Sequence, residues 1–212
     1  MTMPLKVAAL ELGEVDELAR LAMAANTLVF GADGVRRVYN TDVGGLVNAL
    51  TSAGLDGVAG AVILGAGATA RSTVVSLARL GVRQITVVAR TPAKAVPLIS
   101  LAESLGVRLI AQPWAESVVG SDLLISTATA GAVDDRAEEW VSVSGAVFDV
   151  VYDPWPTALA QAAADRGRTV LNGLDLLVHQ AALQVELMTG STVPVEILYD
   201  AGHAALVANS PA

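Results

Sequence analysis

Cysteine is absent from this 212-residue chain, and histidine is rare, with His179 and His203 the only two. The absence of cysteine excludes disulfides, thiol catalysis and cysteine-ligated metals, and it suits a reducing compartment. Two histidines are too few for a histidine metal cluster. We therefore expect a soluble cytoplasmic protein with no metal site.

Long apolar runs and runs of basic residues are also missing. No uninterrupted apolar segment approaches the roughly 18 residues that a membrane span needs, and Met1 to Lys6 lacks the features of a secretory signal. The formal net charge is -8, and Arg36-Arg37 is the longest basic run, which argues against a phosphate-backbone partner. We expect neither membrane nor nucleic acid as a partner, and a small molecule as the ligand.

Apolar residues dominate what is present. Hydrophobic residues make up 53% of the chain and charged residues 16%, with a mean hydropathy of +0.56. This composition is ample for a core and is typical of a parallel sheet covered on both faces. The length allows one large domain, or one domain and part of another.

The most informative stretch runs from Ala61 to Thr91. Ala61 to Leu64 is a short apolar run typical of a buried strand, and a glycine-rich turn and a helical pattern follow it. The helix ends near Leu80-Gly81, and Ile85 to Val88 is a second buried strand. Strand, glycine turn, helix and strand form the βαβ unit of dinucleotide-binding folds.

The glycine turn reads Gly65-Ala66-Gly67-Ala68-Thr69-Ala70. Gly65 would allow the tight turn, Gly67 would let the backbone approach a pyrophosphate, and the small Ala70 would let helix and strand pack closely. Phosphates would then lie at the helix N-terminus, where unpaired amides favour negative charge. An ordinary glycine turn is the alternative, and the flanking strands favour nucleotide binding.

The end of the second strand indicates which nucleotide is bound. NAD-linked enzymes commonly have an acid there for the ribose 2′-hydroxyl, whereas this chain has Ala89-Arg90-Thr91, with Lys94 shortly after. A guanidinium in place of an acid favours the 2′-phosphate of NADP. Alternatively, Arg90 and Lys94 are only solvated cations.

Elsewhere the pattern alternates between strands and helices. We predict an α/β fold with three parts: a partial substrate-binding domain over 1–55, a doubly wound, Rossmann-like NADP-binding domain over 56–175, and C-terminal helices over 176–212 that pack back on the first part. In the first part, Val15 to Ala24 predicts a helix and residues 28–38 a hairpin. Asp42 or Thr41 is placed to cap a helix that runs to about Ser52.

Seven motifs recur in the order found in one enzyme family. They are Thr2-Met3-Pro4-Leu5-Lys6, Ala25-Asn26-Thr27, Asn40-Thr41-Asp42-Val43-Gly44, Gly65-Ala66-Gly67, Ala89-Arg90-Thr91, Asp149-Val150-Val151-Tyr152-Asp153-Pro154 and Gly173-Leu174-Asp175-Leu176-Leu177-Val178-His179-Gln180-Ala181. From Thr2 to about Gly190 the chain resembles the shikimate dehydrogenases. The resemblance implies reversible, NADP-linked reduction of 3-dehydroshikimate to shikimate, a step of aromatic amino-acid biosynthesis.

The resemblance also implies roles for particular residues. Lys6 is similar to the family's catalytic lysine and Asp42 to its paired aspartate, a combination that can transfer the hydroxyl proton and stabilise an oxyanion. The positions similar to the family's substrate contacts are Thr2, Asn26, Tyr152 and Gln180, and Val150 and Gly173 resemble backbone neighbours of the nicotinamide. His179 is expected to pack, the alternative being a catalytic base. Asp175, where the family commonly has glycine, is expected to cap a helix, the alternative being contact with the nicotinamide ribose.

The main departure from the family is at the start of the chain. Shikimate dehydrogenases have some sixty further residues there, with the first strands of the substrate domain and a serine pair for the substrate carboxylate. We therefore expect a late start codon or a catalytically impaired NADP-binding fragment, and an exposed sheet edge that could pair in a homodimer. An NAD-linked quinate/shikimate dehydrogenase remains an alternative. A folate-linked methylene dehydrogenase is a remoter one.

Overall fold

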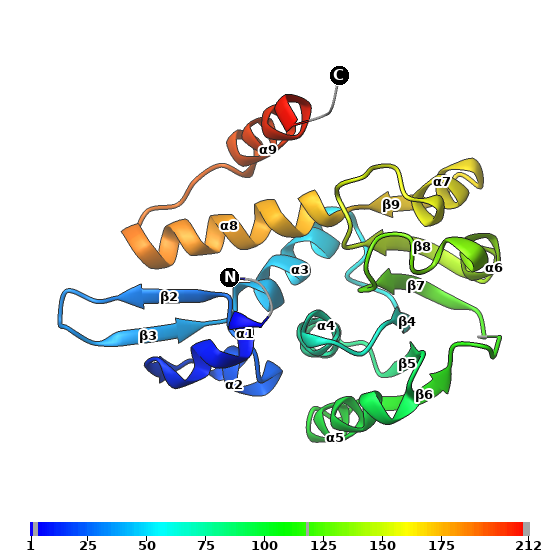
Figure 1. Cartoon of the computed structure of the whole chain (residues 1–212), viewed down its shortest axis with the longest axis horizontal. Coiled ribbons are helices and arrows are strands. Elements are labelled where there is room, and N and C mark those ends of the chain that lie inside the picture. Colours follow the sequence, from blue (N-terminus) through cyan, green and yellow to red (C-terminus); the bar gives the residue numbers. More distant parts are fainter. Residues whose placement is uncertain (2–3, 118, 210–212) are drawn as a thin grey trace.

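The computed structural model describes residues 1, 4–117 and 119–209. Two lobes are visible in Figure 1: a small N-terminal lobe with a projecting hairpin, and a larger lobe built on a sheet. The helices α3 (Thr41–Ser52) and α8 (Gly173–Thr189) run between them.

The larger lobe contains a six-stranded parallel sheet. Its strand order is β6-β5-β4-β7-β8-β9, and the order along the chain reverses between β4 and β7. The carboxyl ends of strands on either side of such a reversal form a crevice, which is where open α/β sheets bind ligands. The strands are β4 (Gly60–Leu64), β5 (Gln84–Ala89), β6 (Arg108–Pro113), β7 (Ser121–Ser126), β8 (Ser144–Asp149) and β9 (Thr169–Leu171).

Helices cover both faces of this sheet. On one face, α3, α4 (Ala68–Arg79) and α5 (Val96–Ser104) contribute Leu50, Leu77 and Leu98 to one apolar cluster. On the other face, α6 (Ala137–Ser142) and α7 (Ala158–Asp165) contribute Trp140 and Leu159 to a second cluster. Short 3₁₀ turns precede α5 and α6 at η2 (Pro92–Ala95) and η3 (Asp134–Arg136). The doubly wound, Rossmann-like α/β prediction is confirmed.

The N-terminal lobe is built on a three-stranded sheet of order β1-β3-β2. The hairpin of β2 (Thr27–Phe30) and β3 (Arg36–Tyr39) is antiparallel, and β1 (Glu14–Val15) pairs with β3 in parallel. The helix predicted from Val15 to Ala24 is shorter: α2 (Glu17–Ala22) begins after Asp16, whose carboxylate accepts from the amides of Leu18 and Ala19. That cap stops the helix from extending back into β1.

The start of the chain contains an element that sequence reasoning missed. Lys6 lies in the one-turn helix α1 (Leu5–Ala8), which continues into the 3₁₀ turn η1 (Ala9–Glu11). Pro4 sits at the N-cap, where its missing amide costs nothing, so it starts this helix and does not break it. The amide of Ala25 donates to the carbonyl of Lys6 at 2.7 Å and ties α1 to the segment before β2.

Close packing of α3 on α8 joins the lobes. A Cβ atom on Gly45 would lie 2.8 Å from both the Cβ and the backbone N of Gln180, so only glycine permits this approach. Glycine in the first turn of α3 therefore serves packing as well as weakening the helix locally. The final helix α9 (Val195–Asn209) lies against α8, where Gly202 meets Leu174 and the Tyr199 hydroxyl donates to Asp175 at 2.7 Å.

Asn40 caps α3, where the sequence favoured Thr41 or Asp42. The Asn40 side-chain oxygen accepts from the amide of Val43 at 3.1 Å. Its side-chain nitrogen donates to the Ala24 carbonyl and to the Ser72 hydroxyl, so one buried amide joins α3, the N-terminal lobe and α4. Because Asn40 makes the cap, the Asp42 carboxylate is free for other contacts.

We expect Asn40→Ala to lower the free energy of unfolding by about 1–3 kcal/mol, because it removes a helix cap and leaves buried polar groups unpaired. Chemical denaturation measures this change. Ser52→Ala is the matched control, because Ser52 is exposed at the other end of the same helix. Equal stability of the two variants would contradict the role given to Asn40.

Candidate functional site

The glycine turn after β4 opens on a cavity of about 540 Å³. Gly65 has a φ of +108°, and a Cβ there would lie 2.6 Å from the Thr127 hydroxyl, so the turn requires glycine. Helix α4 starts after Gly67 with no side-chain cap among the described residues and no acid in its first turn. Its first amides are therefore available to an anion.

Most of the residues predicted to bind cofactor line this cavity. Those that do are Gly65, Ala66, Gly67, Ala89, Arg90, Thr91 and Lys94. Ala68 is the first residue of α4 and does not line the cavity, whereas Thr69, Val150 and Gly173 line the second cavity, described below.

Sequence reasoning missed other residues of the first cavity. They are Trp114, Thr127, Ala128, Thr129 and Ala132. Trp114 follows β6 and Thr127 follows β7, so the rule that ligands bind at the carboxyl ends of parallel strands could have indicated both. Trp114 packs edge-on against the buried Trp140, with ring centroids 5.5 Å apart.

A second cavity of about 500 Å³ lies on the other side of the start of α4, where Gly67 lines the first cavity and Thr69 lines the second. It brings together residues that are far apart in the chain. Its lining includes Lys6, Asn26, Asp42, Tyr152 and Gln180 from the sequence prediction, and Met1, Leu176, Leu177 and Gln184, which were not predicted. Thr2 lies outside the described residues.

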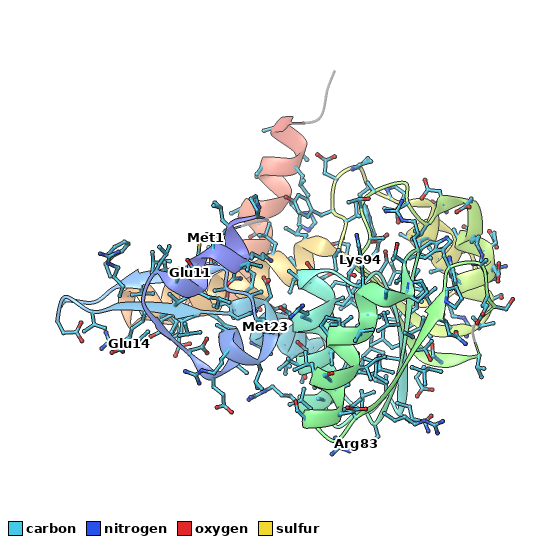
Figure 2. All side chains as sticks on the ribbon, turned by 60° about the horizontal axis from the view of Figure 1, so that its bottom comes forward. Met1, Glu11, Glu14, Met23, Arg83 and Lys94 are labelled. Carbon is cyan, nitrogen blue, oxygen red and sulfur yellow. The ribbon has the colours of Figure 1, made fainter. Side chains whose placement is uncertain are left out.

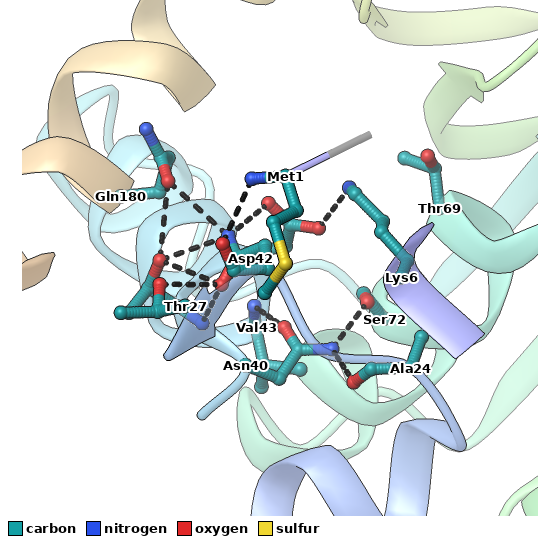
Figure 3. Close-up of polar contacts among 12 residues, drawn as sticks. Met1, Lys6, Ala24, Thr27, Asn40, Asp42, Val43, Thr69, Ser72 and Gln180 are labelled. Atoms are coloured by element: carbon teal, nitrogen blue, oxygen red, sulfur yellow. Dashed lines mark hydrogen bonds and ion pairs between the residues drawn. The ribbon is translucent and has the colours of Figure 1, made fainter. Parts of the chain in front are cut away.

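Lys6 and Asp42 form an ion pair in this cavity. The Lys6 Nζ is 2.5 Å from Asp42 Oδ2, and the two side chains are only 15% and 9% exposed (Figure 3). Lys6 comes from α1 and Asp42 from the first turn of α3. A short, shielded pair of this kind holds the ammonium in one position, with the rest of its hydrogen-bonding capacity facing the cavity.

Asn26 is the centre of the polar network behind the pair. Its side-chain nitrogen donates to Asp42 Oδ1 at 2.8 Å and to Gln180 Oε1 at 3.2 Å, and its oxygen accepts from the Thr41 amide at 2.9 Å. Gln184 reaches the same network through the Thr27 hydroxyl. Asn26 is buried, so it orients Asp42 from behind as well as lining the cavity.

The opposite wall comes from the segment after β8 and from the start of α8. A Cβ on Gly173 would lie 2.1 Å from the Val150 carbonyl oxygen, so glycine is needed for this close approach. The side chain of Asn172 and that of Asp175 form a capping box at the start of α8. The cap predicted for Asp175 is therefore present.

His179 is buried in α8, edge-on to the Tyr199 ring, and does not line either cavity. Burial lowers the pKa of His179, and the nearby Asp175 carboxylate opposes this shift in part. Burial, together with the hydrogen bond to Asp175, raises the pKa of Tyr199. His179 therefore packs inside the protein, as the sequence predicted, and burial disfavours its charged form.

A glycine turn at a helix start without a side-chain cap, together with a lysine–carboxylate pair in a second cavity, is the arrangement expected of a nicotinamide-nucleotide dehydrogenase. The family model for the shikimate 5′-dehydrogenase C-terminal domain matches residues 173–201. The NADP-dependent shikimate dehydrogenase of Bacillus cereus strain B4264 is 36% identical over 206 residues, covering 92% of this chain and 74% of its own length.

Comparison with solved structures points to the same family as the sequence relatives. A shikimate 5-dehydrogenase from Mycobacterium fortuitum superposes with a TM-score of 0.85 at 40% identity, covering 94% of this chain and 75% of that one. The Thermus thermophilus enzyme in complex with NADP(H) and shikimate gives 0.81 at 30% identity, covering 96% and 77%. The chain belongs to the shikimate dehydrogenase family. Among its described residues, no helix is long and apolar enough to cross a membrane.

The lowered pKa of His179 makes stability depend on pH. Below about pH 6.5 the unfolded state binds a proton that native His179 resists, so the free energy of unfolding falls as the pH drops. We expect His179→Phe to remove part of this slope between about pH 5 and 7. Denaturant titrations across that range measure it, and His203→Phe, at an exposed position, is the control. Identical slopes in both variants would contradict this assignment.

Proposed function

We propose that this chain catalyses the reversible, NADP-dependent reduction of 3-dehydroshikimate to shikimate, in aromatic amino-acid biosynthesis. The observation that carries the proposal is the Lys6–Asp42 ion pair, which lies in a cavity lined by Thr69, two residues after Gly67 of the glycine-turn cavity. Family membership indicates the substrate class, and the ion pair can transfer the proton that oxidation or reduction of such a substrate requires.

The first cavity fits NADP by its donor set. The uncapped amides of α4 suit the pyrophosphate, and Arg90 and Lys94 suit the 2′-phosphate, with no acid among the lining residues to select a free 2′-hydroxyl. Trp114 follows β6, the strand next to β5, and its ring forms an aromatic wall of the cavity that suits the adenine. Bound there, the cofactor would supply reversible hydride transfer to or from the substrate carbon.

Lys6 and Asp42 have different proposed roles: Lys6 transfers the proton, and Asp42 orients Lys6. The Lys6 ammonium would donate a proton to the developing alkoxide during reduction, and the neutral amine would take it back during oxidation. Asp42 holds the ammonium in place, and Asn26 in turn holds Asp42. These contacts keep one proton donor fixed at the wall of the cavity, with its side chain only 15% exposed.

The other polar groups of the second cavity are proposed substrate contacts. Tyr152 is the most exposed of them at 42%, so its hydroxyl is accessible to a polyol. Gln180 Oε1 already accepts from Asn26 and Thr41, which leaves the amide group partly committed to the protein. Thr2 keeps its proposed role from the family resemblance alone. A substrate dense in hydroxyls suits such a lining, because unpaired buried polar groups are costly.

The division into parts, the assembly and the location are proposals too. We propose a substrate-binding part over 1–55, an NADP-binding part over 56–175 and closing helices over 176–212. The free edge of β2, with Phe30 73% exposed, supports self-pairing into a homodimer, which sedimentation analysis would test. A cytoplasmic location would follow from the biosynthetic role.

The test of the function has two independent measurements on this chain: NADPH binding by titration, and shikimate oxidation with NADP. We expect the chain to bind NADPH and to oxidise shikimate with NADP. Binding without turnover would favour the alternative of a catalytically impaired NADP-binding fragment. Turnover with NAD at equal efficiency would favour the quinate/shikimate type, and failure to bind either nucleotide would contradict the proposal.

Arg90 should select the phosphorylated cofactor. We expect Arg90→Ala to weaken NADPH binding by about 1.5–3 kcal/mol, because one charge-assisted contact is lost, and to leave NADH binding unchanged. The control is Arg83→Ala, because Arg83 precedes β5 and Arg90 follows it; Figure 2 shows Arg83 far from Lys94. Isothermal titration with both nucleotides measures the difference. Equal losses for NADPH and NADH would exclude the proposed contact.

Lys6 should act through proton transfer and not through charge alone. We expect Lys6→Ala to lower kcat by about 10²–10⁴-fold with little change in NADPH affinity. Lys6→Arg keeps the charge, but arginine does not release its proton, so its kcat should also fall. A kcat near the wild-type value in Lys6→Arg would show that charge alone suffices.

A further inference from the structure

Asp149 is a buried carboxylate that has no cationic partner among the described residues. It ends β8, is 1% exposed, and takes part in none of the ion pairs formed among the described residues. Burial raises its pKa, and hydrogen bonds from Thr157, Val151 and Ser126 oppose that shift. A buried charge is expensive, so its retention calls for a local reason.

Its hydrogen bonds join the two ends of one segment. The Thr157 hydroxyl donates to Asp149 Oδ2 at 2.8 Å, and the Val151 amide donates to Oδ1 at 3.2 Å. Thr157 also accepts from the Ala160 amide at 3.1 Å and so caps α7. One carboxylate thus anchors both the beginning and the end of residues 151–157, which connect β8 to α7.

The start of this segment, with Val150 before it, forms part of the wall of the second cavity. The Val150 amide donates to the Ser126 carbonyl at 3.1 Å, and the Gly173 amide donates to the Val151 carbonyl at 3.1 Å. Val150, Tyr152 and Gly173 all line the second cavity. In the described part of the chain the Tyr152 hydroxyl has no hydrogen-bond partner, so the backbone of this segment determines where Tyr152 lies.

We propose that Asp149 is a positioning residue: with Thr157 it forms a clasp that holds residues 150–152 against Gly173, and so determines the wall that receives the nicotinamide end of the cofactor. Asp149 lines neither cavity, so it would act through the residues that do. The carboxylate offers two acceptor oxygens to its donors, whereas asparagine would offer one and add two donors of its own. The inference deepens the proposed function and rests on it for the identity of the ligand.

Two probes separate the clasp from general destabilisation. NADPH reaches both cavities in the proposed function, whereas 2′,5′-ADP carries the same adenosine and 2′-phosphate without nicotinamide. We expect Asp149→Asn and Thr157→Val each to weaken NADPH binding about tenfold, equivalent to about 1.4 kcal/mol, and to leave 2′,5′-ADP binding within about twofold. Thr157→Ser keeps the hydroxyl and should restore NADPH affinity. Parallel losses for both ligands, or no loss for either, would overturn the proposal.

Hydrogen exchange of the free protein provides a readout that needs no ligand. In Thr157→Val the amides of residues 150–157 should exchange about tenfold faster, because an anchor of the segment is lost, with wild-type rates in Thr157→Ser and in β4. Uniform acceleration across the sheet, or unchanged exchange in the segment, would count against the clasp. If wild-type chain fails to bind NADPH, the proposed function is wrong, and the exchange rates still decide whether the clasp exists.

Discussion

The contact of Gly45 with Gln180 determines the geometry of the whole site. It lets α3 and α8 pack closely, and these two helices carry Asp42, Gln180 and Gly173 to the same cavity. Any larger residue at position 45 would push α8 away from α3, and the polar network between Asn26 and Gln180 would open. The geometry of the proposed site therefore depends on the absence of a side chain at Gly45, a residue that takes no part in the chemistry itself.

Local features of the site were predictable from the sequence. The turn at Gly65, the helix that follows it and the cations after β5 lie within some thirty residues, so periodicity and turn chemistry alone place them together. The proximity of Lys6 to Asp42 followed only from the family resemblance. Nothing in residues 1–8 indicates a partner 36 positions away, because an ion pair between two elements that are distant in the sequence leaves no local pattern.

The features of the site that the sequence did not predict depend on contacts between distant segments, or on which of several neighbouring residues caps a helix. Three adjacent residues, Asn40, Thr41 and Asp42, could each cap α3, and tertiary contacts to Ala24 and Ser72 favour Asn40. Asn26 resembles a turn residue in sequence, yet it is buried because several elements converge on it. Trp114 follows an ordinary strand, and only the sheet order brings it beside Arg90.

The start of α4 connects the two halves of the site. Gly67 lines the first cavity, and Thr69, two residues later, lines the cavity of Lys6 and Asp42. The first turn of a helix is rigid when its body is buried, as the side chains of Val74 and Leu77 are here. A phosphate held by this turn would therefore be held at a constant distance from the proton donor. The Asp149 clasp would hold the opposite wall, formed by Val150, Tyr152 and Gly173, in a fixed position as well. The hydride acceptor and the proton donor would then keep a constant distance and orientation to each other.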